Sequence, residues 1–384
     1  MGNTTSRNNI EYLKSVGAPP MMPVKRSKQS EYSQAIGSNK NVYSLKTTIA
    51  RPPFNGVWSM YLPPCESPIA RTGQCHVYDP VTDCLIICYG IDAHGHHLND
   101  MWALDLKTLL WRKISDSILS PRTNCSAILY GREMIIFGGT DPRGYLSDLH
   151  SINLETLQIT RFDCQIPPRE KCILFLGSSS TLFVWSGFNG VILNDMYEYN
   201  FSDGSCQAKE VEISGRRAAV YCDELGSRFS YVFGSTRGHP LAKFDRELGT
   251  FEIMRCGGTA PPPELTDAMC VVACHYLFVI GGQIDSDYTY LYAVNLDDQQ
   301  WFAFYVMPDN DSTLLTDGFI TKAGLFKLPR QYSGSLAFSA AKRALVCTMG
   351  SLFLDPPSVS IISIGNALSV LHLRDDLLPM LHMF

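Results

Sequence analysis

Few residues in this 384-residue chain have the types and spacing that enzyme chemistry requires. The run His94-Gly95-His96-His97 places three imidazoles around a glycine, and imidazoles in such a turn can converge on a metal ion. Because no carboxylate partner is identifiable for them, the pattern favours a solvent-exposed turn over a metal site. The sequence contains no G-x-S-x-G, P-loop or H-E-x-x-H motif. We therefore expect no catalytic residue, no bound metal and no cofactor.

The thirteen cysteines are the other group of reactive side chains. Most stand in the middle of apolar segments, where a reduced thiol acts as a small hydrophobic side chain. Cys84 and Cys88 are four apart on an expected strand, which puts them on one face but too far apart to share a tetrahedral metal. No C-x-x-C pair occurs. This usage predicts free thiols and a reducing, intracellular compartment.

The N-terminus carries a modification motif. Met1-Gly2-Asn3-Thr4-Thr5-Ser6 matches the N-myristoylation pattern, with Gly2 as the acceptor and Ser6 at the required position. The first 50 residues hold seven basic and two acidic side chains, including the cluster Lys25-Arg26-Ser27-Lys28. One acyl chain binds a membrane only reversibly, so basic residues would have to supply a second contact. We expect a cytoplasmic protein that can lie peripherally at a membrane through Gly2.

A repeat dominates the rest of the chain. Six apolar segments run into glycine, and these segments are LIICYG, MIIFGG, LFVWSG, SYVFG, LFVIGG and LVCTMG, ending at Gly90, Gly139, Gly187, Gly234, Gly282 and Gly350. The first five glycines are 49, 48, 47 and 48 residues apart, and the sixth follows after 68. A period of this size is typical of repeat architectures, in which each unit buries its apolar face against its neighbours.

Each repeat contains further markers in phase with its glycine. A short alternating segment ends in Asp or Asn, a residue type that starts tight turns, at Asp105, Asn153, Asn200, Asp245 and Asn295. About six residues later a bulky apolar residue opens another segment, at Trp111, Ile159, Phe251 and Trp301. A further strand precedes each glycine strand, and several of these open with Pro-Arg. The unit therefore predicts four short strands, which form one blade of a β-propeller.

These residues carry a family resemblance. The pairs Gly138/Gly139 and Gly281/Gly282, the Asx-ended strand and the later tryptophan resemble the kelch repeat. The resemblance covers roughly Arg71 to Leu373, although four of the six repeats replace the first glycine, with Tyr89, Ser186, Phe233 and Met349. It implies an all-β, kelch-type β-propeller.

The two ends of the chain decide the expected number of blades. After Gly350, VSIISIG and LSVLHL would complete the sixth blade. Upstream, SQAIG, NVYSLK and VWSMY predict strands of a further blade, and PMLHMF at residues 379–384 could supply its inner strand. Strands from both termini would then close the ring and remove its exposed edges. We expect seven blades, with six as the alternative.

Composition agrees with a soluble, globular chain. Hydrophobic residues make up 45% and charged residues 18%, and no apolar run reaches the ~18 residues that a membrane span requires. The net charge of −5 argues against a general nucleic-acid binder. We expect a flexible basic tail over residues 1–30 and one propeller domain over residues 31–384, with an insertion at residues 306–325.

One face of the propeller is the expected binding surface. The loops between the second and third strands of a blade share a face with the loops that join blades, and this is the loop face. The kelch resemblance implies that it receives an extended peptide from a partner protein. Its expected members are Arg71, Asp92, Arg122, Asp141, Arg143, Arg169, Asn189, Arg237, His239, Asp285, Asp287, Tyr288 and Arg330.

The sequence is compatible with three functions. The first is a non-enzymatic scaffold or adaptor that binds another protein. The alternative is a propeller enzyme of the metal-dependent oxidase or sugar-acid isomerase type, but the sequence lacks a spaced E-x-x-x-D-x-x-x-H set. The third is an adaptor for ubiquitin ligases, for which the roughly 40 residues before the propeller are too few to form a BTB domain.

The myristoylation motif yields a direct test. Gly2→Ala should move the protein from the membrane fraction to the cytosolic fraction, because the acyl chain supplies ~0.8 kcal/mol per buried methylene. Intact-mass measurement of protein from its native cell checks the modification itself. An N-terminus without the myristoyl mass would remove the membrane hypothesis.

Overall fold

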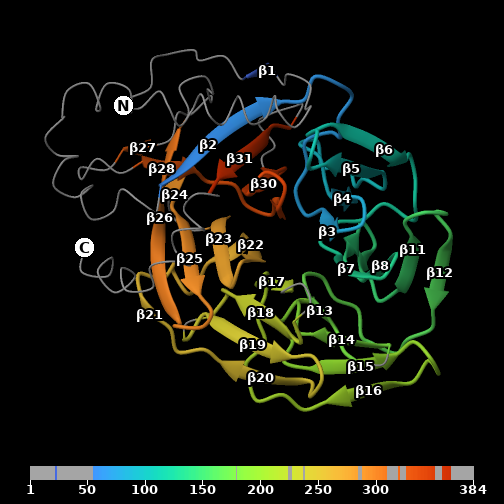
Figure 1. Cartoon of the computed structure of the whole chain (residues 1–384). Helices are drawn as coiled ribbons and strands as arrows, with labels where there is room; N and C mark the ends of the chain where they lie inside the picture. The colour runs from blue at the N-terminus through green and yellow to red at the C-terminus, as the bar shows by residue number, and fades with distance from the viewer. Residues whose placement is uncertain are drawn as a thin grey trace, which may run out of the picture.

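The computed structural model describes residues 22–23, 55–178, 180–223, 227–236, 238–283, 288–308, 319–320, 326–350 and 357–364. These residues form short strands joined by turns, and six four-stranded blades stand around a central axis (Figure 1). No helix within these ranges is long and apolar enough to cross a membrane. The all-β propeller that the repeat predicts is confirmed.

Each of the first four blades comes from one continuous stretch of chain. Blade 1 contains β3 (Cys75–Asp79), β4 (Cys84–Cys88), β5 (Met101–Asp105) and β6 (Trp111–Ser115). Blade 2 contains β7 (Ser126–Tyr130), β8 (Glu133–Phe137), β11 (Leu149–Asn153) and β12 (Ile159–Phe162). Blade 3 contains β13 (Ile173–Leu176), β14 (Thr181–Trp185), β15 (Met196–Asn200) and β16 (Cys206–Lys209). Blade 4 contains β17 (Val220–Asp223), β18 (Phe229–Phe233), β19 (Leu241–Asp245) and β20 (Thr250–Ile253).

The last two blades join at their outer edges. Blade 5 contains β22 (Thr266–Ala273), β23 (Tyr276–Gln283), β25 (Leu291–Asn295) and β26 (Gln300–Pro308). Blade 6 contains β29 (Ser335–Ser339), β30 (Ala344–Thr348), β31 (Val359–Ser363) and, from the other end of the chain, β2 (Asn55–Leu62). Because β2 also pairs in parallel with β26, the two blades form one continuous sheet.

Seven further short strands lie beside the six blades within the described residues. β1 (Met22–Pro23) pairs with β2, and β21 (Gly257–Gly258) pairs with β26. A hairpin of β9 (Thr140–Asp141) and β10 (Gly144–Tyr145) extends the loop face of blade 2. The remaining strands, β24 (Tyr288–Thr289), β27 (Phe319–Ile320) and β28 (Phe326–Pro329), form a small sheet.

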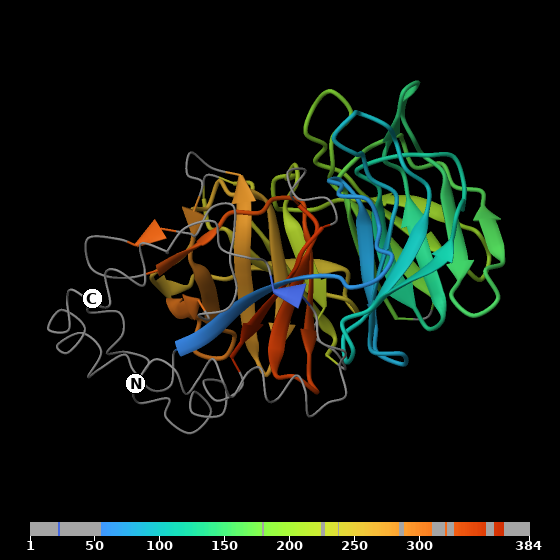
Figure 2. The ribbon, with the colours of Figure 1, turned by 90° about the horizontal axis from the view of Figure 1, so that it is seen from above.

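The expectation of seven blades is wrong, because the described residues form the six-bladed alternative. The sequence pattern predicts VWSMY as an outer strand of a seventh blade, whereas it lies in β2 as the outer strand of blade 6. There Trp58 pairs with Ile362 and Met60 with Ser360, and both views show β2 against the strands of that blade (Figure 1, Figure 2). The segments SQAIG, NVYSLK, LSVLHL and PMLHMF lie outside the described residues, as does most of the predicted insertion at 306–325.

The predicted turn residues are confirmed. The Asp105 carboxylate accepts hydrogen bonds from the amides of Lys107 and Thr108, both at 2.8 Å. The same geometry recurs after the third strand of blades 2 to 5, where the acceptors are Asn153, Asn200, Asp245 and Asn295. An acceptor at this position satisfies amides that the strand ladder leaves free, so it ends the third strand and starts the fourth.

The apolar side chains gather between blades. Six clusters fill the six junctions between neighbouring blades. The cluster between blades 6 and 1 joins Val346 to Leu85 and Trp102, so the ring is closed by packing. All five tryptophans belong to these clusters and therefore pack between blades. The thirteen cysteines are free thiols, and seven of them are buried.

The placement of β2 can be tested by truncation. Removing residues 1–62 should destabilise the whole ring, because Trp58, Met60 and Tyr61 lose their buried positions. At roughly 1.5–3 kcal/mol for each buried side chain, the loss is on the order of 5 kcal/mol. Thermal unfolding measures it, with removal of residues 1–21 as the control. Equal melting temperatures for the two truncated proteins would show that β2 does not close blade 6.

Candidate binding site

Six residues, one from each blade, surround the centre of the propeller and form the central ring. They are Gly73, Asn124, Lys171, Ala218, Asp267 and Ser333, and all have φ between +50° and +65°. The amide of Asn124 donates to the Gly73 carbonyl at 2.7 Å, and the amide of Lys171 donates to the Asn124 carbonyl at 2.9 Å. Asp267 and Ser333 continue the pattern with bonds to the carbonyls of Ala218 and Asp267. These backbone bonds join neighbouring blades directly beside the axis.

Glycine is required at one place in this ring. A Cβ atom on Gly73 would lie 2.2 Å from the Thr123 hydroxyl oxygen, and the φ of Gly73 is +65°. Thr123 in turn donates to the Gly73 carbonyl at 3.2 Å. Blades 1 and 2 therefore approach each other too closely here for any larger residue.

The central ring lines a pocket of about 640 Å³, the central pocket. Every blade contributes to its wall, through Thr72, Gly73, Ile91, Thr123, Asn124, Lys171, Ile192, Arg217, Ala218, Ser235, Thr266, Asp267, Gln283, Tyr332 and Ser333. Backbone bridges join Thr72 to Ile91 and Glu170 to Phe188, so the interblade loops and the loops after the second strands meet on one face. The pocket therefore opens within the expected loop face.

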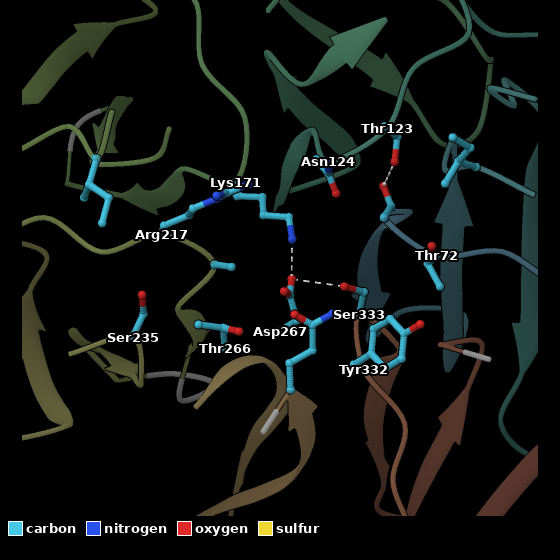
Figure 3. A pocket seen from close by; sticks show the side chains of 15 residues that line it. Thr72, Thr123, Asn124, Lys171, Arg217, Ser235, Thr266, Asp267, Tyr332 and Ser333 are labelled. Carbon is cyan, nitrogen blue, oxygen red and sulfur yellow. Dashed lines mark hydrogen bonds and ion pairs between the residues drawn. The ribbon is translucent and has the colours of Figure 1, made fainter. Parts of the chain in front are cut away.

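An ion pair crosses the central pocket. Lys171 of blade 3 reaches Asp267 of blade 5, with 2.6 Å between Nζ and Oδ1 (Figure 3). The hydroxyl of Ser333 donates to the same carboxylate oxygen at 3.0 Å. The side chains of Lys171 and Asp267 are 20% and 11% exposed to solvent, so both can contact a ligand that enters the pocket.

A second charged pair lies at the side of the pocket. The Glu170 carboxylate accepts a hydrogen bond from Asn124 at 2.9 Å and forms an ion pair with Arg217 at 3.4 Å. The Arg217 guanidinium also lies over the Phe188 ring, 3.8 Å from its centroid. This stacking holds a half-exposed cation at the rim of the pocket.

An apolar surface continues outward from this rim. It consists of Tyr145, Phe188, Val191 and Ile192, which we name the apolar lip. Val191 and Ile192 are 63% and 48% exposed, and Tyr145 is 37% exposed. The Tyr145 and Phe188 rings meet edge to face at 6.2 Å. Because Ile192 also lines the central pocket, the lip and the pocket form one continuous surface.

Three of the predicted binding residues have a structural role. Arg71, Arg122 and Arg169 are fully buried, and each makes a bidentate ion pair with an aspartate that precedes the third strand of its own blade. Arg169 donates to the two Asp195 oxygens at 2.6 and 2.9 Å and to the Ser186 carbonyl at 3.0 Å. These guanidinium groups face the blade interior, so they are not available to a partner.

The electrostatics of these pairs follow from burial and contact. Burial alone would raise the pKa of Asp100, but the hydrogen bonds and charge of Arg71 outweigh it and hold the pKa below its usual value.

Blade 4 departs from the pattern of buried arginine–aspartate pairs, because Pro240 stands where an aspartate would be expected. Arg216 donates instead to the carbonyls of Gly234 and Pro240, and burial lowers its pKa to about 10.

The other described members of the predicted set lie on the loop face. Asp141 binds Arg143 within the β9–β10 hairpin, and the Arg143 side chain is 79% exposed. Asn189 is half-buried beside the apolar lip, and His239 is exposed. Arg330 donates to the carbonyls of Gly281 and Gly282. Arg237, Asp285 and Asp287 lie outside the described residues, and Tyr288 is described only by its backbone in β24.

The histidine turn has a carboxylate partner that the sequence did not reveal. Asp92 accepts hydrogen bonds at 2.8 Å from the amides of His94 and His96, and its other oxygen lies 3.0 Å from His96 Nδ1. The expectation that no carboxylate accompanies these imidazoles is therefore wrong. A carboxylate that caps its own turn is read from sequence as an ordinary turn residue, which explains the error.

Sequence reasoning missed the residues that line the central pocket. Lys171, Arg217 and Asp267 carry no motif of their own. A signal for one of them existed, because Lys171 stands two residues after Arg169, just as Gly73 and Asn124 stand two after Arg71 and Arg122. Recurrent glycine and asparagine at this position indicate a left-handed backbone, which a turn at the axis requires.

The buried arginine pairs can be tested by removing one charge. Asp195→Asn leaves the fully buried Arg169 without its carboxylate. Breaking a buried pair costs about 3–5 kcal/mol, and because Asp195 is 32% exposed we expect a loss of about 2–3 kcal/mol. Urea unfolding measures the change. Asp116→Asn, which breaks the exposed ion pair with Lys113, is the control and should cost less than about 1 kcal/mol. Similar losses in both variants would contradict the structural role of Arg169.

A buried histidine predicts how stability depends on pH. His150 is fully buried on β11, with Nε2 3.4 Å from the Tyr89 hydroxyl, and Nδ1 lies 3.6 Å from Asp148. Burial and the charge of Arg122 lower the pKa of His150 to about 4, below its ordinary value of 6.5. The unfolded chain therefore takes up a proton first as the pH falls from 6.5 towards 4, and this contribution to stability is lost across that window.

The measurement is the melting temperature between pH 7 and pH 4. The wild-type protein should lose stability steadily in this range, and His150→Phe should make that part of the curve less steep, with the remaining slope due in part to His76, whose pKa burial also lowers to about 4. His239→Phe, which changes an exposed imidazole, is the control. A wild-type slope that His150→Phe leaves unchanged would assign the pH dependence to other groups.

Comparison with known proteins identifies the family to which the chain is similar. A model described as the KLHDC2/KLHL20/DRC7 Kelch-repeats domain matches residues 37–234, just over half of the chain. The leucine-zipper-like transcriptional regulator 1 homolog of Drosophila melanogaster is 24% identical over 255 residues, which cover 58% of this chain and 25% of that protein. Kelch domain-containing protein 1 of Mus musculus is 24% identical over 216 residues, covering 53% of this chain and 47% of that protein.

A third match is shorter and more similar. Acyl-CoA-binding domain-containing protein 5 of Arabidopsis thaliana is 35% identical over 108 residues, which cover 27% of this chain and 16% of that protein. The matched segments thus span less than half the length of each of these three relatives. The family model and the bladed fold agree with the repeat in the sequence, and the chain belongs to the kelch-repeat family that this model describes.

Proposed function

We propose that this protein is a non-enzymatic scaffold that binds another protein by receiving an extended peptide segment at the central pocket. The observation that carries the proposal is the shape and lining of that pocket, which draws residues from all six blades and opens on the loop face. Membership of the kelch-repeat family supports a protein-interaction role in general terms.

The chemistry of the pocket suits a peptide. Hydroxyl groups of Thr72, Thr266 and Tyr332 line it together with the Lys171–Asp267 pair. Such groups can donate to and accept from a peptide backbone, while cations and anions of the pocket select charged side chains. These charges are held in ion pairs, Lys171 with Asp267 in the wall and Arg217 with Glu170 beside it, so a charged side chain of the peptide can exchange with one member of a pair.

The apolar lip supplies the anchoring energy in this proposal. Tyrosine and arginine are enriched among the residues that dominate binding energies at protein interfaces. Tyr145 and Arg217 flank Phe188 on the lip, and the exposed Val191 and Ile192 lie next to them. A bulky apolar side chain of the partner would lie on this surface while the adjoining peptide enters the central pocket.

Attachment to a membrane forms the second part of the proposal. It rests on the sequence alone, on Gly2 and the basic residues that follow it, all of which lie outside the described part of the chain. In this arrangement the acylated N-terminus would hold a cytoplasmic propeller near the membrane, and the loop face would present the partner there.

A matched pair of variants tests the binding site. Ile192→Asp places a charge on the apolar lip at the edge of the central pocket. Leu248→Asp is the control, because Leu248 is also exposed, at 63%, but lies in the turn after the third strand of blade 4 on the opposite face. Partners are first identified by crosslinking in the native cell and narrowed to a peptide.

The affinity of that peptide is then measured for each variant. Loss of an interface anchor typically costs 2 kcal/mol or more, so Ile192→Asp should weaken binding by roughly 30-fold and Leu248→Asp should leave it unchanged. A peptide that binds both variants as tightly as the wild-type protein would place its site elsewhere.

A further inference from the structure

We propose that the turn formed by Asp92, His94 and His96 is a binding site for a divalent transition-metal ion, with zinc as its representative. This turn follows the second strand of blade 1 and lies on the loop face, next to Ile91 in the wall of the central pocket. The proposed protein-binding function neither requires this site nor depends on it.

The three side chains already converge. One ligand atom from each of Asp92, His94 and His96 lies within 4.8 Å of the others. The Nδ1 atoms of His96 and His94 lie 3.0 and 3.9 Å from Oδ2 of Asp92. At zinc–ligand bonds of roughly 2.0–2.1 Å, tetrahedral coordination sets neighbouring ligands about 3.4 Å apart. The two separations from Asp92 lie on either side of this value and the third is within 4.8 Å, so side-chain rotations can bring all three atoms to one metal ion.

The backbone holds the carboxylate in place for this purpose. Oδ1 of Asp92 accepts the amides of His94 and His96, which leaves Oδ2 directed at the imidazoles. Two further backbone bonds close the turn, from Asp92 to the His96 carbonyl and from Gly95 to the Asp92 carbonyl.

The ligand set and the exposure define the chemical class. Two imidazoles and one carboxylate suit zinc and its first-row neighbours, and soft metals that require thiolates are disfavoured. The imidazoles are 81% and 74% exposed, so ions reach them without any opening of the fold. On binding, Nδ1 of His96 coordinates the metal, and the neutral imidazole carries its proton on Nε2. Three protein ligands leave a fourth position for water.

The experiment measures zinc binding by calorimetry with the full-length protein. Cys65→Ser and Cys274→Ser are introduced throughout, because these are the exposed thiols among the cysteines and would compete for zinc. The protein should bind one zinc ion, and the double variant His94→Ala/His96→Ala should bind it more than about 100-fold more weakly, since even losing an outer partner of a metal ligand costs about 10–100-fold. His97→Ala is the matched control and should bind zinc like the parent.

The alternatives have distinct outcomes. Asp92→Asn removes the charged ligand but keeps an acceptor for the turn amides, so it separates loss of coordination from loss of the turn, and it should also weaken binding. Equal melting temperatures in the absence of metal show that the variants are folded. Zinc binding that is unchanged in the double variant, or lost equally in His97→Ala, would overturn the proposal.

Discussion

The closed ring depends on a hydrogen bond between neighbouring blades, which joins two backbone groups at five of the six junctions. The amide of the periodic glycine, or of the residue after it, donates to the carbonyl of the residue that opens the next blade. The pairs are Gly90 with Arg122, Gly139 with Arg169, Ser235 with Leu265, Gly282 with Gln331 and Gly350 with Arg71. At the remaining junction the Ser186 hydroxyl donates to Arg216. The bond from Gly350 to Arg71 returns the last blade to the first, so the same contact that spaces the blades also closes the ring.

This constraint explains why the strand-opening arginines are structural. Their carbonyls are held by the preceding blade, and their side chains turn inward to the aspartates of their own blade, as in the pair Arg122–Asp148. A buried guanidinium needs such a partner, because desolvation of an unpaired charge is strongly unfavourable. In the proposed scaffold, recognition falls instead to the residues two positions after the arginines, which form the central ring.

The loop face combines two kinds of surface. Near the axis, the rigid central ring presents Lys171 and Asp267 from backbone positions that hydrogen bonds fix. Farther out, the loops after the second strands carry the exposed side chains of Tyr145 and Ile192 and the turn of Asp92. A rigid frame with variable loops is the usual way in which a repeat fold acquires a specific partner.

The sequence by itself determined the repeat, its four-stranded unit, the Asx turns and the kelch-type propeller, because these follow from local periodicity and turn chemistry. The packing of the tryptophans between blades was also predictable, since Trp102 and Trp301 stand on apolar strand segments.

Only the tertiary structure decided the number of blades and the composition of the site. The pattern of VWSMY identifies an outer strand but not its blade, because strand pairing between residues 57–61 and 359–363 is a contact that no local signal encodes. The same reason applies to the pair Lys171–Asp267, whose members are 96 residues apart, and to the buried arginines, which the sequence placed on a binding surface. Charged residues near turns are usually solvated. Closing the ring places some of them beside a buried partner and others beside the central axis. Only this placement distinguishes the residues that stabilise the blades from those that line the pocket.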